Sequence, residues 1–417
     1  MSFFADLQAR GLVEQVSDPS LGALLDAGDL TAYCGFDPTG PSLHVGSLLQ
    51  IVGLMRLQRA GHRPIALVGG ATGMIGDPSG KTEERKLLTV DVLRENVAGI
   101  RAQLERFLDF SPGRALLVNN YDWFEGVRFI DFLRDVGKHF SVNMMLAKES
   151  VRARLEDREH GISYTEFSYM LLQSYDFLHL ADAHDCRLQI GGTDQWGNIT
   201  AGIDLVRRVR GKQVFGYTQP LVTTADGKKF GKTEAGTSVW LDAARTSAYQ
   251  MFQYFLNADD RDAGRLLRYF TFLPAPRIAE IAAESGKAPE KRIAQRELAR
   301  EVTRMVHGEA ETAKAEETAA SLFGGAADVR AIAANAPRTP FPKSELDDGI
   351  PVIKLLTASR LAPSVSAARR DIEGGGVYVN EERIARIDHK VGPGDLKDGR
   401  FVLLRKGKKN YHVIEFA

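Results

Sequence analysis

The sequence has few cysteines, no excess charge of either sign and no long apolar run. Its two cysteines, Cys34 and Cys186, cannot form a disulfide framework or a zinc site, so we expect two buried thiols and no bound metal. The 54 basic and 54 acidic residues cancel, which argues against a nucleic-acid partner for the chain taken as a whole. No run suits a signal peptide or a membrane span, so we expect a cytoplasmic protein without a membrane partner.

The charges are nevertheless divided unevenly along the chain. From Lys354 to Ala417 there are thirteen Lys and Arg residues against eight Asp and Glu residues, which leaves an excess of negative charge over residues 1–353. The length of 417 residues suits two or three domains. A Pro- and Asp-rich stretch, residues 336–349, predicts a linker before the basic tail. In the tail we expect a helical run over Ile350 to Ile372, then glycine-rich turns and a final strand pair.

Residues 33–47, Y-C-G-F-D-P-T-G-P-S-L-H-V-G-S, join an apolar strand to a helix whose apolar residues recur at helical spacing. Backbone N–H groups at such a junction attract anions. We therefore expect Asp37, Thr39 and His44 to surround a phosphate-sized concavity. The alternative is that His44 only caps the helix.

A second segment, residues 226–234, reads D-G-K-K-F-G-K-T-E. Its lysines flank a glycine, which suits the stabilisation of a triphosphate while pyrophosphate departs. A solvated charge run is the simpler alternative. The earlier segment V-G-G-A-T-G-M-I-G-D-P-S-G-K-T is not a P-loop, because only three residues separate Gly76 from Gly80.

Between the two segments, residues 164–180 predict a helix with a polar face. Tyr169, Gln173 and Asp176 are spaced i, i+4 and i+7 and share that face. A polar stripe on an apolar helix indicates a cavity or a hydrogen-bonding ligand. Farther on, G-G-T-D-Q-W-G-N at residues 191–198 follows a short strand over Arg187 to Ile190, where α/β sheets bind ligands. Asp194 could accept two hydrogen bonds from a ribose diol, or it could cap the following helix.

Together, H-V-G-S and K-F-G-K-T resemble the two signatures of the class I aminoacyl-tRNA synthetases, and the helix over residues 164–180 resembles the tyrosine-binding helix of bacterial tyrosyl-tRNA synthetases. The resemblance spans the whole chain. It implies an α/β fold with a Rossmann-like parallel-sheet catalytic domain over residues 1–246 and a helical anticodon-side domain over residues 247–335. A small α+β S-four-type RNA-binding domain over residues 350–417 would follow the linker.

The resemblance also assigns the substrates L-tyrosine, ATP and tRNA(Tyr). Tyrosine would be activated to tyrosyl-adenylate with release of pyrophosphate and then transferred to the 3′ end of the tRNA. The residues implied for tyrosine are Tyr33, Asp77, Tyr169, Gln173, Asp176 and Gln195. Those implied for ATP are Gly35, Asp37, His44, Gly46, Ser47, Gly192, Asp194, Lys229 and Lys232, and those implied for catalysis are Thr39, His44, Lys81, Arg85, Lys229, Lys232 and Thr233.

The tyrosine carboxylate is already ionised, so catalysis would rest on positioning and charge stabilisation, with Mg²⁺ arriving on ATP. One departure concerns Ser47, where family members commonly carry a second His. The tail would contact RNA phosphates, and no DNA partner is implied. The residues expected to do so are Arg369, Arg370, Lys406, Lys408 and Lys409.

The helical region predicts one apolar stripe, Ile293, Leu298, Val302 and Met305, on a solvated helix. The resemblance implies a homodimer, for which the stretch Phe124 to Met145 could supply the contact, although it could equally be core. Two alternatives remain. A tryptophanyl enzyme shares the fold, although Tyr33 with Asp176 suits a phenol better than an indole. An inactive RNA-binding paralogue is the other, and the intact lysines of K-F-G-K-T argue against it.

Overall fold

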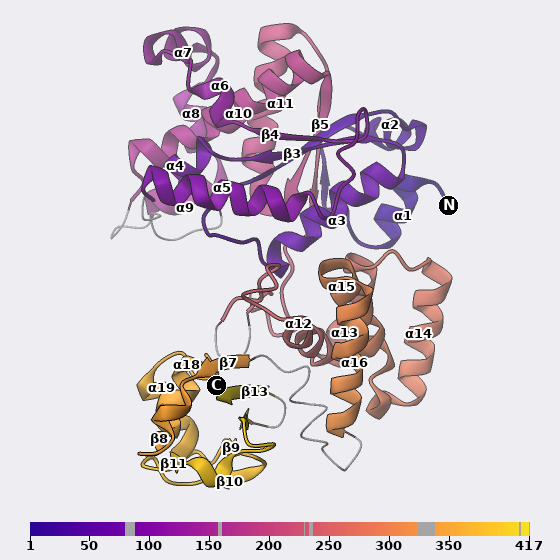
Figure 1. Cartoon of the computed structure of the whole chain (residues 1–417). Helices are drawn as coiled ribbons and strands as arrows, with labels where there is room; N and C mark the ends of the chain where they lie inside the picture. Colours follow the sequence, from indigo (N-terminus) through magenta and orange to yellow (C-terminus); the bar gives the residue numbers. More distant parts are fainter. Residues whose placement is uncertain are drawn as a thin grey trace. The chain divides into compact units, whose positions relative to one another are not determined.

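A computed structural model describes residues 1–79, 88–156, 161–228, 230–232, 237–323, 338–407 and 410–416. The chain divides into two compact units (Figure 1). The first contains Met1–Phe230 and Arg268–Phe272, and the second contains Gly231–Leu267 and Leu273–Ala417. No helix among these residues is long and apolar enough to cross a membrane.

The first unit is built on a six-stranded sheet with the order β1-β6-β5-β2-β3-β4. Five neighbouring strands are parallel and β1 is antiparallel at one edge. The strands are β1 (Gln15–Val16), β2 (Thr31–Phe36), β3 (Arg63–Val68), β4 (Leu116–Asn119), β5 (Cys186–Gly192) and β6 (Phe215–Gln219). This arrangement confirms the predicted α/β class with a parallel sheet.

Helices cover the sheet of the first unit, as Figure 1 shows. They are α1 (Phe3–Ala9), α2 (Leu21–Ala27), α3 (Val45–Arg59), α4 (Thr72–Ile75), α5 (Val90–Leu104), α6 (Tyr121–Phe124), α7 (Phe129–Asp135), α8 (Val142–Leu146), α9 (Glu149–Glu156), α10 (Tyr164–His184) and α11 (Trp196–Arg210), with short 3-10 turns η1 (Gly137–His139) and η2 (Thr193–Gln195). Most residues of the central strands β2, β3 and β5 are buried, because helices cover both faces of a parallel sheet.

Both cysteines are buried in central strands, as the sequence predicts. Cys34 lies in β2 and Cys186 in β5, and neither forms a disulfide. Burial raises the pKa of each thiol to about 12. The thiols therefore stay protonated at neutral pH and contribute to packing rather than to chemistry.

The strand order fixes where a ligand can bind. β2 pairs with β3 on one side and with β5 on the other, so the direction of strand addition reverses at β2. In open α/β sheets, ligands bind outside the carboxyl ends of the strands at such a switch point. The segments after β2, β3 and β5 carry most of the polar residues identified from the sequence.

The second unit begins with helices. They are α12 (Ala248–Leu256), α13 (Asp260–Phe270, whose last three residues belong to the first unit), α14 (Ala275–Lys287), α15 (Ile293–His307) and α16 (Glu309–Phe323), with η3 at Pro289–Lys291. The predicted stripe on α15 is partly wrong. Leu298 and Val302 are buried, but Ile293 and Met305 are only half-buried, and Ala294 and Val306 complete the buried face instead. Residues 324–335, the rest of the predicted helical domain, lie outside the described residues.

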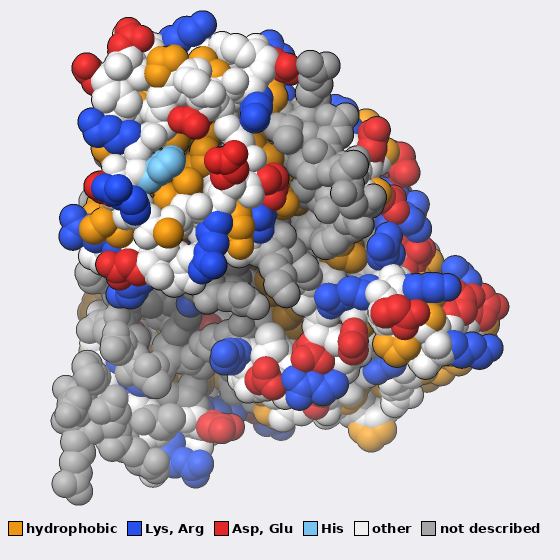
Figure 2. Space-filling view, turned by 90° about the horizontal axis from the view of Figure 1, so that it is seen from below, with side chains coloured by type: hydrophobic (Ala, Val, Ile, Leu, Met, Phe, Trp, Pro, Cys, Tyr) orange, Lys and Arg blue, Asp and Glu red, His pale blue; other side chains and the backbone are white. Residues whose placement is uncertain are grey.

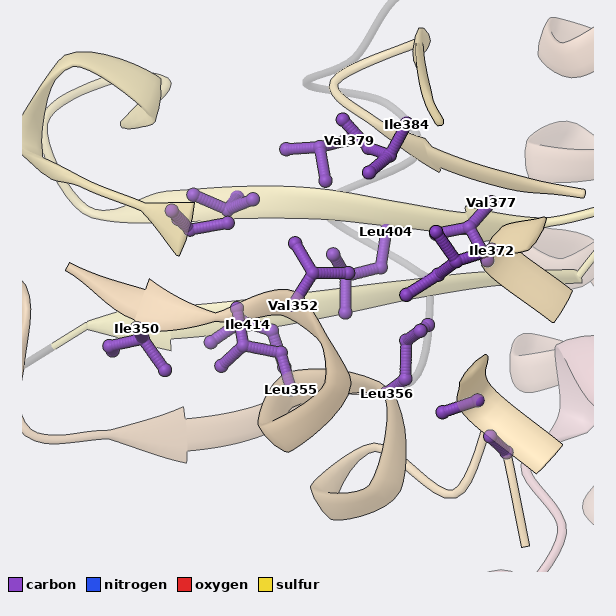
Figure 3. Close-up of a cluster of buried hydrophobic side chains, with 14 of the residues drawn as sticks. Ile350, Val352, Leu355, Leu356, Ile372, Val377, Val379, Ile384, Leu404 and Ile414 are labelled. Carbon is purple, nitrogen blue, oxygen red and sulfur yellow. The ribbon is translucent and has the colours of Figure 1, made fainter. Parts of the chain in front are cut away.

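The rest of the second unit holds a five-stranded sheet of order β10-β9-β12-β13-β7 and a two-stranded sheet, β11-β8. Their strands are β7 (Arg338–Phe341), β8 (Ile350–Pro351), β9 (Val377–Val379), β10 (Glu382–Ile384), β11 (Lys390–Val391), β12 (Phe401–Lys406) and β13 (Asn410–Phe416). The helices are α18 (Val352–Ala358) and α19 (Val365–Glu373), with turns η4 (Lys343–Glu345) and η5 (Pro393–Asp395). Side chains of helices and strands form one apolar core, part of which Figure 3 shows.

Two sequence predictions for this region are wrong. The helical run over residues 350–372 is instead β8 followed by two helices, because Pro363 and its neighbours interrupt the helical pattern between Ala358 and Val365. The predicted linker, residues 336–349, contains β7, which pairs in parallel with β13, and Leu346 of the same stretch is buried in the core. Residues 336–337 lie outside the described residues. The final strand pair, β12 and β13, is confirmed.

Candidate active site

Helix α10 carries the polar face that the sequence predicts. The helix begins after Ser163, whose hydroxyl accepts a hydrogen bond from the backbone N–H of Glu166, and it ends at His184. Tyr169 and Asp176 are buried, whereas Gln173 between them is half-buried. We call the six residues expected from the resemblance to bind tyrosine the α10 pocket; they are Tyr33, Asp77, Tyr169, Gln173, Asp176 and Gln195.

Asp176 is held by two donors that sequence reasoning missed. Asn120 Nδ2 donates to one carboxylate oxygen of Asp176 at 3.1 Å, and Trp123 Nε1 donates to the other at 3.0 Å. The Trp123 ring stacks on His179, with ring centroids 4.3 Å apart. Asn120 follows the carboxyl end of β4, so the rule that directs attention to the residues after β2, β3 and β5 also points to it.

Tyr33 places a buried hydroxyl without a partner beside this carboxylate. Its side chain is 1% exposed, and its Oη has no hydrogen-bond partner. Burial, and after it the charge of Asp176, raises the pKa of the Tyr33 phenol. Burial also raises the pKa of Asp176, against the two hydrogen bonds that lower it. An orphaned hydroxyl next to a desolvated carboxylate is suited to a ligand that brings its own hydroxyl group.

Asp37 joins the same network rather than facing only a phosphate site. Its carboxylate accepts hydrogen bonds from the hydroxyls of Tyr169 and Thr72, both at 2.8 Å. Thr72 in turn accepts from Asn120 at 3.0 Å, so Asp37 and Asp176 are connected through one hydroxyl and one amide. The sequence predicts that Asp37, Thr39 and His44 surround a phosphate-sized concavity. In the structure the side-chain oxygens of Asp37 point to the α10 side, and Thr39 is exposed.

A second cluster surrounds Asp77, which is buried after β3. Gln195 Nε2 donates to Asp77 Oδ2 at 2.7 Å, and Gln195 Oε1 accepts from Gln173 Nε2 at 3.1 Å. Asn198, which sequence reasoning did not identify, donates to Gln173 Oε1 at 2.9 Å. Asp77, Gln173 and Gln195 come from three different segments and meet in one hydrogen-bonded chain. Such a chain offers carboxylate and amide oxygens to a cationic group.

His44 has the position that the simpler alternative predicts. It is the N-cap of α3, and its Nδ1 accepts a hydrogen bond from the N–H of Gly46 at 2.9 Å. Ser47 lies in the first turn of the same helix and donates its N–H to the carbonyl of His44. This cap contact orients the His44 ring at the amino end of α3.

Glycines lie near the carboxyl ends of β2 and β5, where they add no side chain. Gly35 in β2 is exposed, and a Cβ there would meet only a Leu67 methyl group at 3.8 Å. A Cβ on Gly192 at the end of β5 would lie 2.7 Å from a carboxylate oxygen of Asp194, so no larger residue fits without displacing that carboxylate. Asp194 is not the cap of α11, because Gln195 occupies the N-cap position.

The structure brings Phe230 of the second signature segment close to the first signature segment. A Cβ on Gly46 of H-V-G-S would lie 3.7 Å from the carbonyl oxygen of Phe230 in K-F-G-K-T. Within the second segment Lys232 is exposed, and Gly231 donates its N–H to the Tyr254 hydroxyl at 2.9 Å. The other predicted loop residues, Lys81, Arg85, Lys229 and Thr233, lie outside the described residues.

The predicted RNA-contacting residues differ in their surroundings. Arg369 and Arg370 are exposed on α19. Lys406 instead forms an ion pair with Asp371 at 2.7 Å and donates to the carbonyl of Leu361. Lys408 and Lys409 lie outside the described residues. On the face shown in Figure 2, basic and acidic side chains are interspersed rather than separated by sign.

The stretch Phe124 to Met145 is partly core and partly surface. Met145 is buried, and Phe132 and Phe140 pack against apolar clusters. Other side chains of α7–α10 are exposed to solvent, Phe129 by 64%, Ile130 by 69% and Tyr164 by 67%. We call the exposed apolar set the α7–α10 surface; it consists of Phe129, Ile130, Val142, Leu146, Leu155 and Tyr164. Contiguous exposed apolar side chains are typical of interaction surfaces.

Comparison with known proteins gives consistent matches. Residues 25–324 match the family model described as tRNA synthetases class I (W and Y), and residues 330–414 match the tyrosine–tRNA ligase SYY-like C-terminal domain. The chain is 52% identical over 421 residues to the tyrosine–tRNA ligase of Roseiflexus castenholzii, covering 99% of both chains. It is 50% identical over 425 residues to that of Geobacillus stearothermophilus, covering 100% of both.

Among solved structures, the chain resembles a C-terminally truncated mitochondrial tyrosyl-tRNA synthetase from Aspergillus nidulans. The TM-score is 0.70 at 31% identity, over 77% of this chain and 94% of that one. A tryptophanyl-tRNA synthetase from Plasmodium falciparum matches with a TM-score of 0.55 at 14% identity, over 74% of this chain and 84% of that one, which shows a shared fold alone.

Proposed function

The chain belongs to the class I tRNA synthetase family that serves tyrosine and tryptophan, and we propose that the α10 pocket is where it selects its amino acid. The activity is that of a tyrosine–tRNA ligase, which activates L-tyrosine with ATP and transfers the tyrosyl group to the 3′ end of tRNA(Tyr).

We propose that Tyr33 and Asp176 bind the phenolic hydroxyl of tyrosine. The observation that carries this assignment is the buried, unpartnered Tyr33 Oη beside the Asp176 carboxylate. A bound phenol would donate to Asp176 and accept from Tyr33, and so would satisfy both groups. Phenylalanine would leave both groups desolvated and without that partner, which costs free energy for each. An indole has no hydroxyl to satisfy them either.

We assign the ammonium and carboxylate groups of the substrate tyrosine to the cluster of side chains around Asp77. Asp77, Tyr169 and Gln173 would bind the ammonium group, since a buried carboxylate and two side-chain oxygens suit a cation with three N–H donors. Gln195, already hydrogen-bonded to Asp77, would lie near the substrate carboxylate. This orientation directs the carboxylate away from Asp176 and toward the ends of β2 and β5.

ATP would then bind over the glycines at the strand ends. We assign Gly192 and Asp194 to the ribose, and Gly35, Asp37, Gly46 and Ser47 to the remainder of the nucleotide. The tyrosine carboxylate attacks the α-phosphate in line and pyrophosphate leaves, so no protein base is required. Thr39 and His44 would act on the phosphates. The leaving group would be stabilised by Lys81, Arg85, Lys229, Lys232 and Thr233, and Mg²⁺ would enter on the ATP phosphates.

Transfer to tRNA would use the basic tail, with Arg369, Arg370, Lys406, Lys408 and Lys409 contacting phosphates. Arg369 and Arg370 are exposed and available for this role. Lys406 would first have to leave its ion pair with Asp371. We further propose that residues 1–246, 247–335 and 350–417 serve as catalytic, anticodon-side and RNA-binding domains, and that the enzyme works in the cytoplasm, where tRNA is charged.

The assignment of the amino acid is tested by pyrophosphate exchange with tyrosine, tryptophan and phenylalanine in parallel. We expect exchange with tyrosine only. Exchange with tryptophan would identify the tryptophanyl alternative, and no exchange with any amino acid would identify an inactive RNA-binding paralogue.

Replacing Lys232 by alanine should lower the rate of adenylate formation about a hundredfold, because charge stabilisation of a departing group is worth that much at one donor. Lys232 is exposed, so its removal should not disturb packing. Tyrosine affinity measured without ATP should stay within twofold of that of the parent. An equal loss of tyrosine affinity would make Lys232 a ground-state binder or a structural residue.

We propose that a homodimer forms through the α7–α10 surface. Replacing Ile130 by aspartate should then produce monomers in analytical ultracentrifugation, because a charge cannot be buried unpaired in an apolar contact. Val92 on α5 is also exposed and offers a matched control, since Val92→Asp should leave the dimer intact. A parent chain that sediments as a monomer at micromolar concentration would contradict the proposal.

A further inference from the structure

Helix α3 begins within the H-V-G-S signature and carries a buried arginine near its other end. His44 caps its amino end, and Arg56 lies three residues before its last residue. The Arg56 side chain is only 5% exposed, and burial lowers its pKa to about 9. A guanidinium this deeply buried is retained where it satisfies several acceptors.

The acceptors are carbonyl groups at the carboxyl end of α13. Arg56 Nη2 donates to the carbonyls of Thr271 and Arg268, and Arg10, which follows α1, donates to the same two carbonyls, each at 3.4 Å. The last carbonyls of a helix have no intrahelical partner and carry the negative end of its dipole, so two cations suit them. Next to them, the ring of Phe272 lies 3.5 Å from the Arg59 guanidinium.

The same turn of α13 contacts the second signature. Phe270 is fully buried, and its ring stacks on that of Phe230, with centroids 5.7 Å apart and an angle of 20° between the planes. Phe230 is the aromatic residue of K-F-G-K-T and precedes Gly231 and Lys232. Its carbonyl is also the atom that a Cβ on Gly46 would approach. Residues 268–272 belong to the same compact unit as α3 and Phe230.

We propose that Arg56 and Phe270 are positioning residues for adenylate formation. Arg56 fixes the end of α13 to α3, and Phe270 fixes Phe230 to the end of α13. These contacts thus hold Phe230, the residue that precedes Gly231 and Lys232 in the chain, close to Gly46 of H-V-G-S. The inference rests on the proposed role of Lys232, because a well-placed loop matters only if its lysines act on pyrophosphate.

This role predicts a selective defect. Loosening these contacts should impair the steps in which the loop contacts pyrophosphate, in both directions of the first reaction. In the reverse direction a pyrophosphate oxygen attacks the α-phosphorus of tyrosyl-adenylate, and the bond to the tyrosine carboxylate breaks. The KM for pyrophosphate should therefore rise, while tyrosine binding without ATP should not change.

The test is a double-mutant cycle on the full chain with Phe230→Leu, Phe270→Leu and the double variant. Each single change should lower the rate of adenylate formation and raise the KM for pyrophosphate, by about tenfold at most from the loss of one aromatic pair. The double variant should be no more impaired than the more impaired of the two single variants, because both changes break the same contact. Phe107→Leu, at a buried phenylalanine after α5, is the matched control and should alter neither value.

Arg56→Lys provides a second route if Phe270→Leu does not fold. It keeps the charge but loses the planar fork that reaches two carbonyls, and it should raise the KM for pyrophosphate with tyrosine affinity unchanged. Additive effects in the cycle, or a parallel loss of tyrosine affinity, would overturn the proposal. If Lys232→Ala has no effect while the cycle shows coupling, the proposed role of the lysine fails instead. If Lys232→Ala is impaired and the cycle shows no change, the positioning role alone fails.

Discussion

Asp176→Asn should lower kcat/KM for tyrosine in adenylate formation about a thousandfold. The change is isosteric but removes the charged acceptor that the phenol would use. Breaking a buried, charge-assisted hydrogen bond costs roughly 4 kcal/mol, and each 1.4 kcal/mol is a factor of ten. The asparagine would also place its own N–H donor group next to the N–H donors of Asn120 and Trp123. One of these three donor groups would then have no acceptor.

The matched control for this variant lies on the same helix. Asp182→Asn changes an exposed carboxylate that pairs with Arg210 at the surface, and surface pairs contribute little. We expect its kcat/KM to stay within threefold of that of the parent. If Asp176→Asn activated tyrosine as well as Asp182→Asn does, the α10 pocket would be assigned wrongly.

The raised pKa of Asp176 adds a pH dependence to this prediction. Burial favours the protonated carboxyl group, and a protonated group loses an acceptor for the phenol. Tyrosine affinity should therefore be complete at pH values above the raised pKa and should fall as the pH is lowered through it. The Asp176→Asn variant should lack that part of the pH profile. Tyrosine titrations of both proteins over a wide pH range measure the difference.

A chain shortened to residues 1–323 should make tyrosyl-adenylate at the parent rate and lose at least a hundredfold in transfer to tRNA at physiological salt. The six-stranded sheet and the α10 pocket lie wholly within this fragment. The basic tail lies outside it, and RNA affinity falls by a salt-dependent amount for each phosphate that is no longer bound. Exchange and aminoacylation assays on the same preparation separate the two steps.

The structure decides where such a cut belongs. Ending the chain within residues 338–349 would leave β7 without β13, its partner in the sheet, and would expose an unpaired strand. We therefore expect a chain ending at residue 345 to aggregate more than one ending at 323. In the full chain, the Arg369→Ala and Arg370→Ala changes should weaken transfer in the same direction and flatten its salt dependence. Normal transfer by the short chain would show that the tail is not the RNA-binding element.

Much of the site could be predicted because it depends on short-range spacing. Tyr169, Gln173 and Asp176 share a face of α10 through the helical repeat alone, and the strand-to-helix junctions after β2 and β5 follow from apolar runs that end at glycine and proline. The buried cysteines follow from the same runs. Periodicity was less reliable on α15, where Val306 rather than Met305 is buried, because packing against neighbouring helices selects the face.

The sequence by itself determined the α/β class, the polar face of α10 and the two signature segments, since each is encoded by residues within a few positions of one another. The tertiary structure alone decided the partners. Asn120 forms a hydrogen bond with Asp176, which lies 56 positions farther along the chain. Asp371 forms an ion pair with Lys406, and β7 pairs with β13 in the C-terminal sheet instead of serving as a linker. These contacts depend on strand order and on which helix covers which strand, and local periodicity carries no information about either.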